Sequence, residues 1–242
     1  LARYNADGSL DTTFGSGGML TTDIGGTADV ASSVTIQSDD KILVAGNNGT
    51  DFALARYDTY GNLDATFGSG GIFTIDAGDR SSGDYAVYVT EQTDGKIVVV
   101  GQGSTGSGPG PGFAIVRLED NGTADATFGT NGVLVNYIGE YGTPYGATVQ
   151  TDGKILVTGR DNRFFGRTTT ELGLARFNSD GTVDAIGDIL SNDVGTDVTV
   201  QADGKILVTG NDFLRRYNQN LSLDTTFSGD GYLATDFGGS SE

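Results

Sequence analysis

A ten-residue pattern occurs four times in this chain of 242 residues: Gln-x-Asp-(Gly/Asp)-Lys-Ile-(Leu/Val)-Val-x-Gly. Its Asp-Gly pair favours the positive φ of a tight hairpin turn, and the apolar run after the lysine is typical of a strand. All four lysines of the chain stand in this pattern, at intervals of 55, 58 and 51 residues. The pattern therefore predicts a repeated hairpin, at residues 37–46, 92–101, 150–159 and 201–210.

A second pattern lies between these hairpins: Leu-Ala-Arg-Tyr-x-x-x-Gly-x-Leu-Asp-x-Thr-Phe-Gly-x-Gly-Gly, at residues 1–18 and 54–71, with weaker copies starting at Ile115, Leu174 and Leu214. Four strands per repeat are predicted. Strand a ends at the glutamine, strand b follows the lysine, strand c ends near the arginine, and strand d follows the glycine-rich turn. Strand b is apolar on both faces, which indicates an inner strand covered on both sides.

Four short strands at this period predict an all-β, β-propeller-like array of four-stranded antiparallel blades. A β-solenoid and a twisted row of hairpin sheets are the alternatives. The chain opens on strand c, which gives four full repeats plus a half repeat, and we expect either an excerpt of a longer array or an open array. The repeats occupy approximately residues 1–28 (the half repeat), 29–83, 84–143, 144–195 and 196–242 of a single domain.

The charge balance narrows the possible partners. The chain has 14 basic and 32 acidic residues, a net charge of −18, so nucleic acid and anionic membrane surfaces are unfavourable partners. No apolar run reaches the roughly 18 residues that a membrane-spanning helix needs, and no membrane insertion is expected. Histidine and cysteine are absent, which excludes Ser-His and Cys-His catalysis within this sequence.

Together the two patterns resemble the delta-sixty repeat over essentially the whole chain. That family is found as tandem arrays in large secreted or surface proteins of bacteria, so the resemblance implies propeller-like blades and an extracellular setting. It implies no established activity. The copy around Asp184 departs from the pattern, because it lacks Thr-Phe-Gly-x-Gly-Gly, and strand d of that blade is expected to be short or missing.

Asx-rich turns before strand d raise the question of calcium. Oxygen-bearing side chains at alternate positions beside a glycine are typical of calcium loops, although the terminal glutamate of an EF-hand is absent. Asn and Asp also favour turns without any metal, and this is the alternative interpretation. No other cofactor is expected. The calcium candidates are Asn5, Asp7, Asp11, Asp180 and Asp184.

The most regular chemical feature is an arginine that precedes an aspartate by eight residues in all five copies of the second pattern, as in Arg117 and Asp125. It could be an acid–base pair or a substrate clamp, or else an ion pair that fixes the turn before strand d. A catalytic site is needed once, whereas this pair occurs five times, which favours the ion pair. The same argument assigns the motif lysines to the scaffold. No catalytic residue is predicted.

The connection between strands b and c varies most from copy to copy, and variable loops on one face of a repeat array are where binding usually differs. One such loop places arginines beside phenylalanines, a combination typical of binding hot spots. Alternatively, these phenylalanines fold back onto a neighbouring blade. The predicted binding loop comprises Arg160, Arg163, Phe164, Phe165 and Arg167.

These features favour a non-catalytic structural or adhesive segment (a stalk, filament or adhesin) of a secreted or cell-surface bacterial protein. Protein or glycan partners are expected, together with self-association through the array. The alternative is a propeller that binds a glycan or calcium through its b–c loops. A second alternative is a glycosidase or lyase that works with carboxylates. The expectation is that the chain is not an enzyme.

Overall fold

The structure is a computed structural model that describes residues 1–26, 28–78, 83–103, 112–136, 142–161, 171–187 and 193–234. In these parts of the chain the regular structure consists of sixteen β-strands. Within these ranges no helix is long and apolar enough to cross a membrane. The strands are β1 (Val30–Ile36), β2 (Ile42–Asn47), β3 (Phe52–Tyr57), β4 (Ile72–Ile75), β5 (Tyr85–Glu91), β6 (Ile97–Gly103), β7 (Gly112–Leu118), β8 (Val133–Asn136), β9 (Gly142–Val149), β10 (Ile155–Asp161), β11 (Glu171–Phe177), β12 (Val183–Ile186), β13 (Asp197–Val200), β14 (Ile206–Thr209), β15 (Phe213–Tyr217) and β16 (Tyr232–Ala234).

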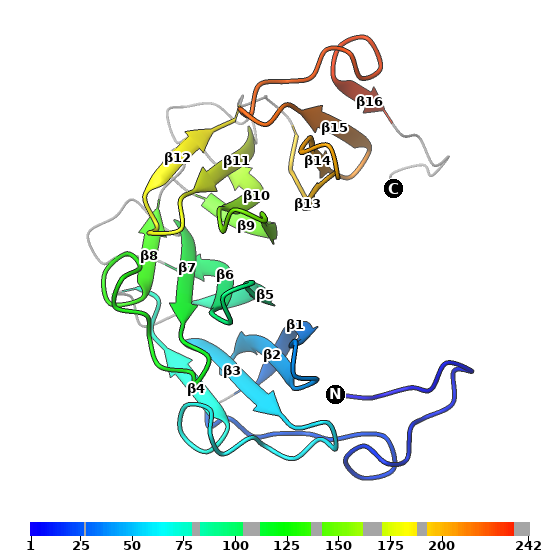
Figure 1. The fold of residues 1–242 in the computed structure, drawn as a ribbon, viewed down its shortest axis with the longest axis vertical. Coiled ribbons are helices and arrows are strands. Elements are labelled where there is room, and N and C mark those ends of the chain that lie inside the picture. Colours follow the sequence, from blue (N-terminus) through cyan, green and yellow to red (C-terminus); the bar gives the residue numbers. More distant parts are fainter. Residues whose placement is uncertain are drawn as a thin grey trace.

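Four antiparallel sheets of four strands each follow one another along the chain: β1–β4, β5–β8, β9–β12 and β13–β16. We call them blades 1 to 4. In each blade the strands lie side by side in sequence order, and Figure 1 shows the four blades fanned into an open arc with β1, β5, β9 and β13 on its inner side. The predicted propeller-like array of four-stranded blades is confirmed. The prediction that strand b is an inner strand is also confirmed, because β2, β6, β10 and β14 pair on both edges.

The Asp-Gly turns close each a–b hairpin as the sequence predicts. In blade 2 the backbone N–H of Gln92 donates to the carbonyl of Lys96 at 2.7 Å, and Gly95 between them has φ of 83°. In blade 1 Asp40 stands at the glycine position with φ of 66°, a left-handed conformation that Asp tolerates better than most residues.

The core lies between the blades. Leu43 and Ala45 of β2 share one buried cluster with Val89 of β5 and with Val99 of β6, so the face of one blade covers the face of the next. Equivalent clusters join blade 2 to blade 3 and blade 3 to blade 4. Each sheet thus buries its apolar residues only by stacking on its neighbour, as expected of a repeat array.

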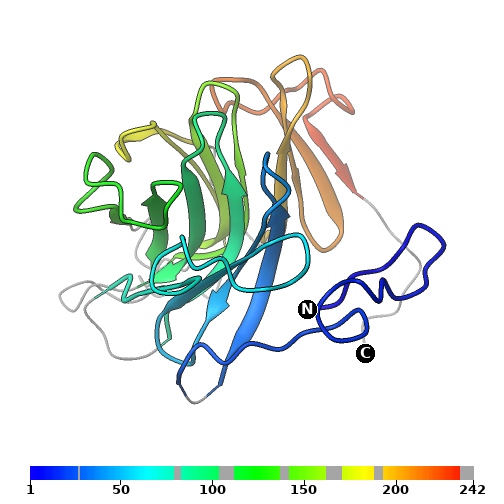
Figure 2. The same ribbon diagram turned by 60° about the horizontal axis from the view of Figure 1, so that its bottom comes forward.

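The N-terminal half repeat lies outside the four sheets. Figure 2 shows this segment in dark blue, running as a looped stretch outside the stacked sheets. Isolated bridges join Ala2 to Met19 and Tyr4 to Leu10, so it keeps the c–d part of the repeat. Its Phe14 is fully buried against Ile42, Ala55 and Tyr57 of blade 1.

Blade 3 differs from the sequence-based expectation in its fourth strand. This strand is present as β12, with four residues like β4 and β8. Phe177 pairs with Val183 and Ala175 pairs with Ile186, so β12 begins directly after the c–d turn. The loss of Thr-Phe-Gly-x-Gly-Gly therefore shortens the loop between the c–d turn and strand d, and strand d itself remains.

Candidate functional site

The predicted Arg/Asp ion pair forms in all five repeats. The arginine Nε donates to Oδ2 of the aspartate, and in blade 2 both side chains are nearly fully buried, with 7% of Arg117 and 1% of Asp125 exposed. Because strand c and the turn before strand d are tied by this pair, it holds the c–d connection in place. The pairs are Arg3–Asp11 at 2.8 Å, Arg56–Asp64 at 2.9 Å, Arg117–Asp125 at 2.6 Å, Arg176–Asp184 at 2.5 Å and Arg216–Asp224 at 2.7 Å.

The second carboxylate oxygen serves the turn. Oδ1 of Asp64 accepts from the backbone N–H of Thr66 at 3.0 Å and from its hydroxyl at 2.6 Å. Burial opposes the charge of Asp64, but these hydrogen bonds and the charges of Arg56 and Lys41 outweigh it and lower its pKa to about 2. The carboxylate is therefore ionised under ordinary conditions and acts as a fixed anion.

Each motif lysine joins the same aspartate from strand b. Nζ of Lys96 lies 2.8 Å from Asp125 and 2.7 Å from Glu119. Hydrogen bonds to these two carboxylates raise the pKa of Lys96, which excludes it as a neutral nucleophile at ordinary pH. The other pairs are Lys41–Asp64 at 3.4 Å, Lys154–Asp184 at 2.9 Å and Lys205–Asp224 at 2.9 Å.

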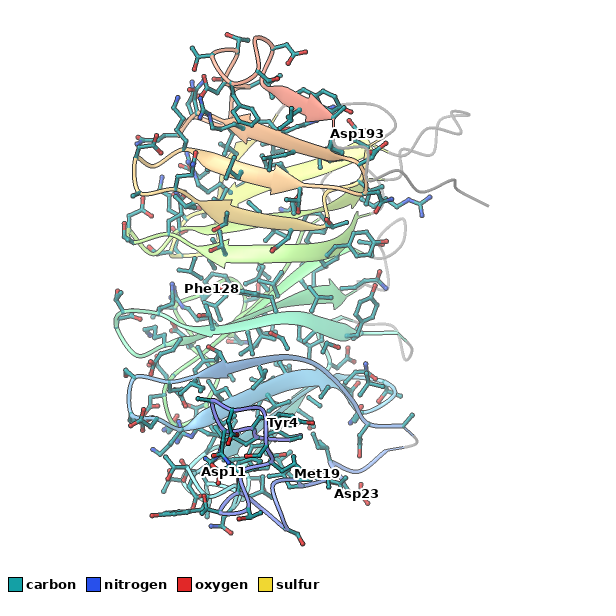
Figure 3. The ribbon with its side chains drawn as sticks, turned by 90° about the vertical axis from the view of Figure 1, so that its right-hand side faces the viewer. Tyr4, Asp11, Met19, Asp23, Phe128 and Asp193 are labelled. Carbon is teal, nitrogen blue, oxygen red and sulfur yellow. The ribbon has the colours of Figure 1, made fainter. Side chains whose placement is uncertain are left out.

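The arginine of the Arg/Asp pair also forms hydrogen bonds to the next repeat. Nη1 of Arg56 donates to the backbone carbonyl of Asp120 at 2.5 Å and to its carboxylate at 2.8 Å, and Nη1 of Arg117 donates to the carbonyl of Ser179. The guanidinium of Arg117 stands 4.7 Å from the ring centroid of Phe128, the residue labelled between the blades in Figure 3. One side chain thus ties its own turn, an aromatic ring and the following blade together.

Two clefts with polar side chains in their linings open between blades, at the end that carries the a–b turns. The larger, about 640 Å³, lies between blades 3 and 4 and is lined by Gln150, Asp152, Lys154, Arg176, Gln201 and Ala202, among others. The smaller, about 450 Å³, lies between blades 2 and 3 and shares Gln150 and Asp152 with it. Both volumes fall in the range of small-molecule sites.

Three of the four motif glutamines, Gln92, Gln150 and Gln201, line these clefts, and the sequence reading assigned them no role. Nε2 of Gln92 donates to the carbonyl of Gly153 in the next blade at 3.3 Å, and Gln37 reaches Glu91 in the same way at 3.1 Å. Oε1 of all four is buried and accepts no hydrogen bond within the part of the chain that the structure describes. Recurrence of glutamine directly before the turn was the available signal.

Arg215 is another residue that sequence reasoning missed. It stands in β15 where Ala55 and Val116 stand in blades 1 and 2, yet it is 8% exposed. Its guanidinium pairs with Asp193 and lies 5.3 Å from the ring centroid of Phe213 and 4.9 Å from that of Tyr232. Its charged side chain thus packs and pairs in blade 4 at a position where the other blades have the methyl group of an alanine or the isopropyl group of a valine.

The calcium candidates already bond within their own turns. Oδ1 of Asp7 accepts from the backbone and hydroxyl of Ser9 at 2.9 and 2.6 Å, and Asp180 does the same with Thr182. Asn5 donates its amide to Ser9 and Asp11 pairs with Arg3, while Asp184 pairs with two cations. Within the described ranges no group of three or more acidic residues is placed to hold a metal ion. Calcium binding stays a prediction.

The predicted binding loop is placed only at its start. Arg160 lies near the end of β10, half-buried, and its Nε has no hydrogen-bond partner among the residues that the structure describes. Arg163, Phe164, Phe165 and Arg167 lie outside the described residues, so the loop stays a prediction.

Among the residues that the structure describes, one carboxyl group has a strongly raised pKa. Asp84 is buried where blade 1 is followed by blade 2, and its Oδ2 accepts from the backbone N–H of Ala77 at 2.9 Å. Burial, and then the charge of Asp76, raise the pKa of Asp84 to about 7. Asp84 is therefore a carboxyl group that exchanges its proton near neutral pH.

Four-stranded blades that bury their faces on one another, tied by a repeated Arg/Asp/Lys network, define a β-propeller-type repeat protein. The chain belongs to the family described as domain of unknown function (DUF5122) beta-propeller. The match covers more than half of the chain, at residues 1–14, 37–67, 92–128, 150–185 and 201–227. This agrees with the propeller expected from the delta-sixty resemblance and does not confirm that particular family. No curated protein matches the sequence.

Several solved structures share the fold. A catalytically inactive virginiamycin B lyase from Staphylococcus aureus matches with a TM-score of 0.53 and 16% identity over 90% of this chain and 59% of that one. The Pan2 WD40 domain of Neurospora crassa matches at 0.51 and 11% identity, over 80% and 48%. A gluconolactonase from Xanthomonas campestris matches at 0.50 and 14% identity, over 87% and 62%. The chain thus spans about three fifths of the length of that lyase.

These neighbours correct one expectation. Because a lyase and a gluconolactonase are built on this fold, the expectation that the chain is not an enzyme is wrong as a deduction from the repeat architecture, which enzymes share. The argument behind it was that in-phase repetition of the charged residues leaves no room for a catalytic site. A propeller can place its catalytic groups in one blade only, so repetition elsewhere does not exclude them. At these identities the likeness shows the fold alone.

Proposed function

We propose that this chain is a structural and adhesive segment of a secreted or cell-surface bacterial protein, and that it binds a glycan or protein partner along its array. The observation that carries the proposal is the arginine of the first four repeats, which bonds both its own turn and the next repeat, as Arg56 does with Asp64 and the carbonyl of Asp120. Such a chain of bonds makes the blades a rigid unit, which suits a stalk or an adhesive surface.

The two inter-blade clefts are the best candidates for the partner site. Their amide, carboxylate, ammonium and hydroxyl groups can both donate and accept hydrogen bonds, which matches the hydroxyl groups of a glycan. The cleft face lies opposite the b–c loops, because strands b and c of each blade run from the a–b turn end and back to it. The array therefore offers two faces for attachment, the clefts and the loops.

A glycan array together with immobilised surface proteins tests this proposal. We expect saturable binding of the purified chain to at least one polysaccharide or surface protein. Substitutions that fill the larger cleft should weaken this binding. Failure to bind in both formats would contradict the adhesive function.

A second function is favoured by Asp84. A carboxyl group with a pKa near 7 beside a second carboxyl group is suited to general acid–base catalysis, as in hydrolysis of a glycoside or lactone. An Asp84→Asn variant tests it: loss of turnover of a glycoside or lactone substrate supports catalysis, and an unchanged rate assigns Asp84 to the fold.

A further inference from the structure

The first blade exposes apolar residues at positions that the other blades bury. Val34 of β1 stands three residues before the motif glutamine and is 56% exposed. The residues at the same position in the next three blades are Val89 at 2%, Ala147 at 3% and Val198 at 3% exposed. Each of these three packs on strand b of the preceding blade, as Val89 does on Leu43 and Ala45.

The N-terminal strand shows the same difference. Tyr4 is 63% exposed, whereas its counterparts Tyr57, Leu118, Phe177 and Tyr217 are at most 4% exposed. The backbone hydrogen bonds of residues 1–4 go to the segment around the glycine-rich turn. The N–H of Arg3 donates to the carbonyl of Gly18 at 2.9 Å, and the carbonyl of Leu1 accepts from the N–H of Leu20 at 2.9 Å. No strand within the described ranges pairs with its other edge, where strand b lies in each complete blade.

The ion network of the half repeat is also one member short. In the four complete blades the aspartate pairs with an arginine and with the strand-b lysine. Asp11 pairs with Arg3 and, among the described residues, with no lysine. Figure 3 shows Tyr4, Asp11 and Met19 together at the end of the array beside blade 1.

A cavity of about 220 Å³ lies between the half repeat and blade 1. It is lined mainly by apolar groups, including those of Leu1, Leu20, Val30, Val44 and Ala53. Val44 is half-buried there, while its counterparts Val99, Val157 and Val208 are fully buried. We call the cavity, Val34, Tyr4 and Asp11 the first-blade surface.

We propose that the first-blade surface binds a β-hairpin of the repeat's own sequence, Gln-x-Asp-Gly-Lys-Ile-Leu-Val-x-Gly. Its strand b pairs with the free edge of residues 1–4, its leucine covers Val34 and Val44 as Leu43 covers Val89 and Val99, and its lysine reaches Asp11. Three independent features specify this occupant: the apolar positions, the open edge and the lone aspartate. The interface is the one already formed three times inside the molecule, and it does not depend on the adhesive function.

The chain itself supplies the test. Leu1 corresponds to Leu214, three residues after Asn211 in the shortest b–c connection, so residues 196–213 can be joined directly ahead of Leu1 with native spacing. We expect hydrogen exchange of the amides of Ala2 and Tyr4 to slow at least about tenfold, and the Tm to rise. Exchange at the native speed in the lengthened protein would overturn the proposal.

Two matched controls separate specific docking from a longer chain. In the first, the lysine of the appended hairpin is changed, Lys205→Glu in the added copy only, so that a carboxylate faces Asp11. In the second, Leu207→Asp places a charge against Val34, again in the added copy only, because Leu207 stands at the position of Leu43, which packs on Val89 of the following blade. Both should return exchange and Tm toward the native values, and protection retained by both would also overturn the proposal.

A second copy of the chain is the competing occupant, and the oligomeric state of the native protein distinguishes it. We expect light scattering to show a monomer at every concentration, and hydrogen exchange to show that Tyr4 stays accessible. A dimer that protects Tyr4 and Val34 would assign this surface to self-association and contradict the hairpin.

Discussion

Arg117 holds Asp125 at 2.6 Å through Nε while its Nη1 bonds the carbonyl of Ser179 in the following blade. The aspartate fixes the c–d turn of blade 2, and the carbonyl belongs to the c–d turn of blade 3. A single side chain thereby couples the conformation of one turn to the position of the next, and the same coupling recurs along the array.

Arg117→Met should destabilise the protein by about 3 kcal/mol, because the substitution leaves the buried Asp125 without one of its two cationic partners. Urea unfolding followed by circular dichroism measures the change. Arg3→Met is the matched control, since Arg3 makes the same bonds to Asp11 and to the next repeat at Thr59 but is 32% exposed. We expect a clearly smaller loss there, and equal losses at both sites would contradict the argument that burial of the pair sets its contribution.

Asp84 should make stability fall as pH rises. Its pKa is raised from 3.8 to about 7 in the folded state, so between these values the folded state holds a proton that the unfolded state has lost. Asp84→Asn removes this penalty, and we expect it to raise stability at pH 8 by on the order of 1 kcal/mol and to change it little at pH 4. Urea midpoints at the two values check this, and an equal loss at both would contradict it.

The network aspartates should act in the opposite direction at low pH. The pKa of Asp64 is lowered to about 2, and hydrogen bonds from Thr226 and Lys205 lower that of Asp224. Their stabilisation is present above pH 4 and is lost as the pH falls through the folded-state values. A stability maximum between about pH 4 and 6 is expected, and a plateau down to pH 2 would show that these pairs contribute little.

Calcium should stabilise the protein at most modestly. The oxygens of Asp7 and Asp180 accept two hydrogen bonds each from their own turns, and a metal would have to displace them. Melting temperatures in chelator and in millimolar calcium measure the effect. An unchanged Tm would remove the metal interpretation, and a large rise would establish a site that the turn bonds do not block.

Changing the predicted binding loop should spare the fold. We expect Arg163→Ala combined with Phe164→Ala to leave the Tm unchanged and to weaken attachment to a protein or matrix partner, since aromatic and arginine side chains dominate binding energy. Attachment at the native level would exclude this loop as a binding site.

The fold could be predicted because local chemistry and periodicity agree. Asp-Gly before an apolar run specifies the hairpin, and its recurrence specifies blades that must stack. Blade 3 was misjudged at β12 because its missing segment is an excursion between the turn and the strand. A spacing count cannot distinguish a lost excursion from a lost strand.

The site was harder to predict. The spacing of eight identified the Arg/Asp pair, but not that Arg56 also reaches Asp120, which is 64 residues away in sequence. The raised pKa of Asp84 arises from burial and from Asp76 across the connection between two blades, so no sequence motif marks it. Both depend on contacts between repeats, which one repeat's pattern does not contain.

The proposed function is tested most directly by the affinity of the purified chain for the polysaccharide or surface protein that it retains best. Ala202→Trp fills the larger cleft, and Ala6→Trp places the same side chain on an exposed turn outside both clefts. We expect the first variant to lose at least about tenfold in affinity, as a blocked central contact does, and the second to bind like the native chain. Equal binding by all three proteins would contradict the clefts as the adhesive surface, and absence of binding by the native chain would contradict the adhesive function itself.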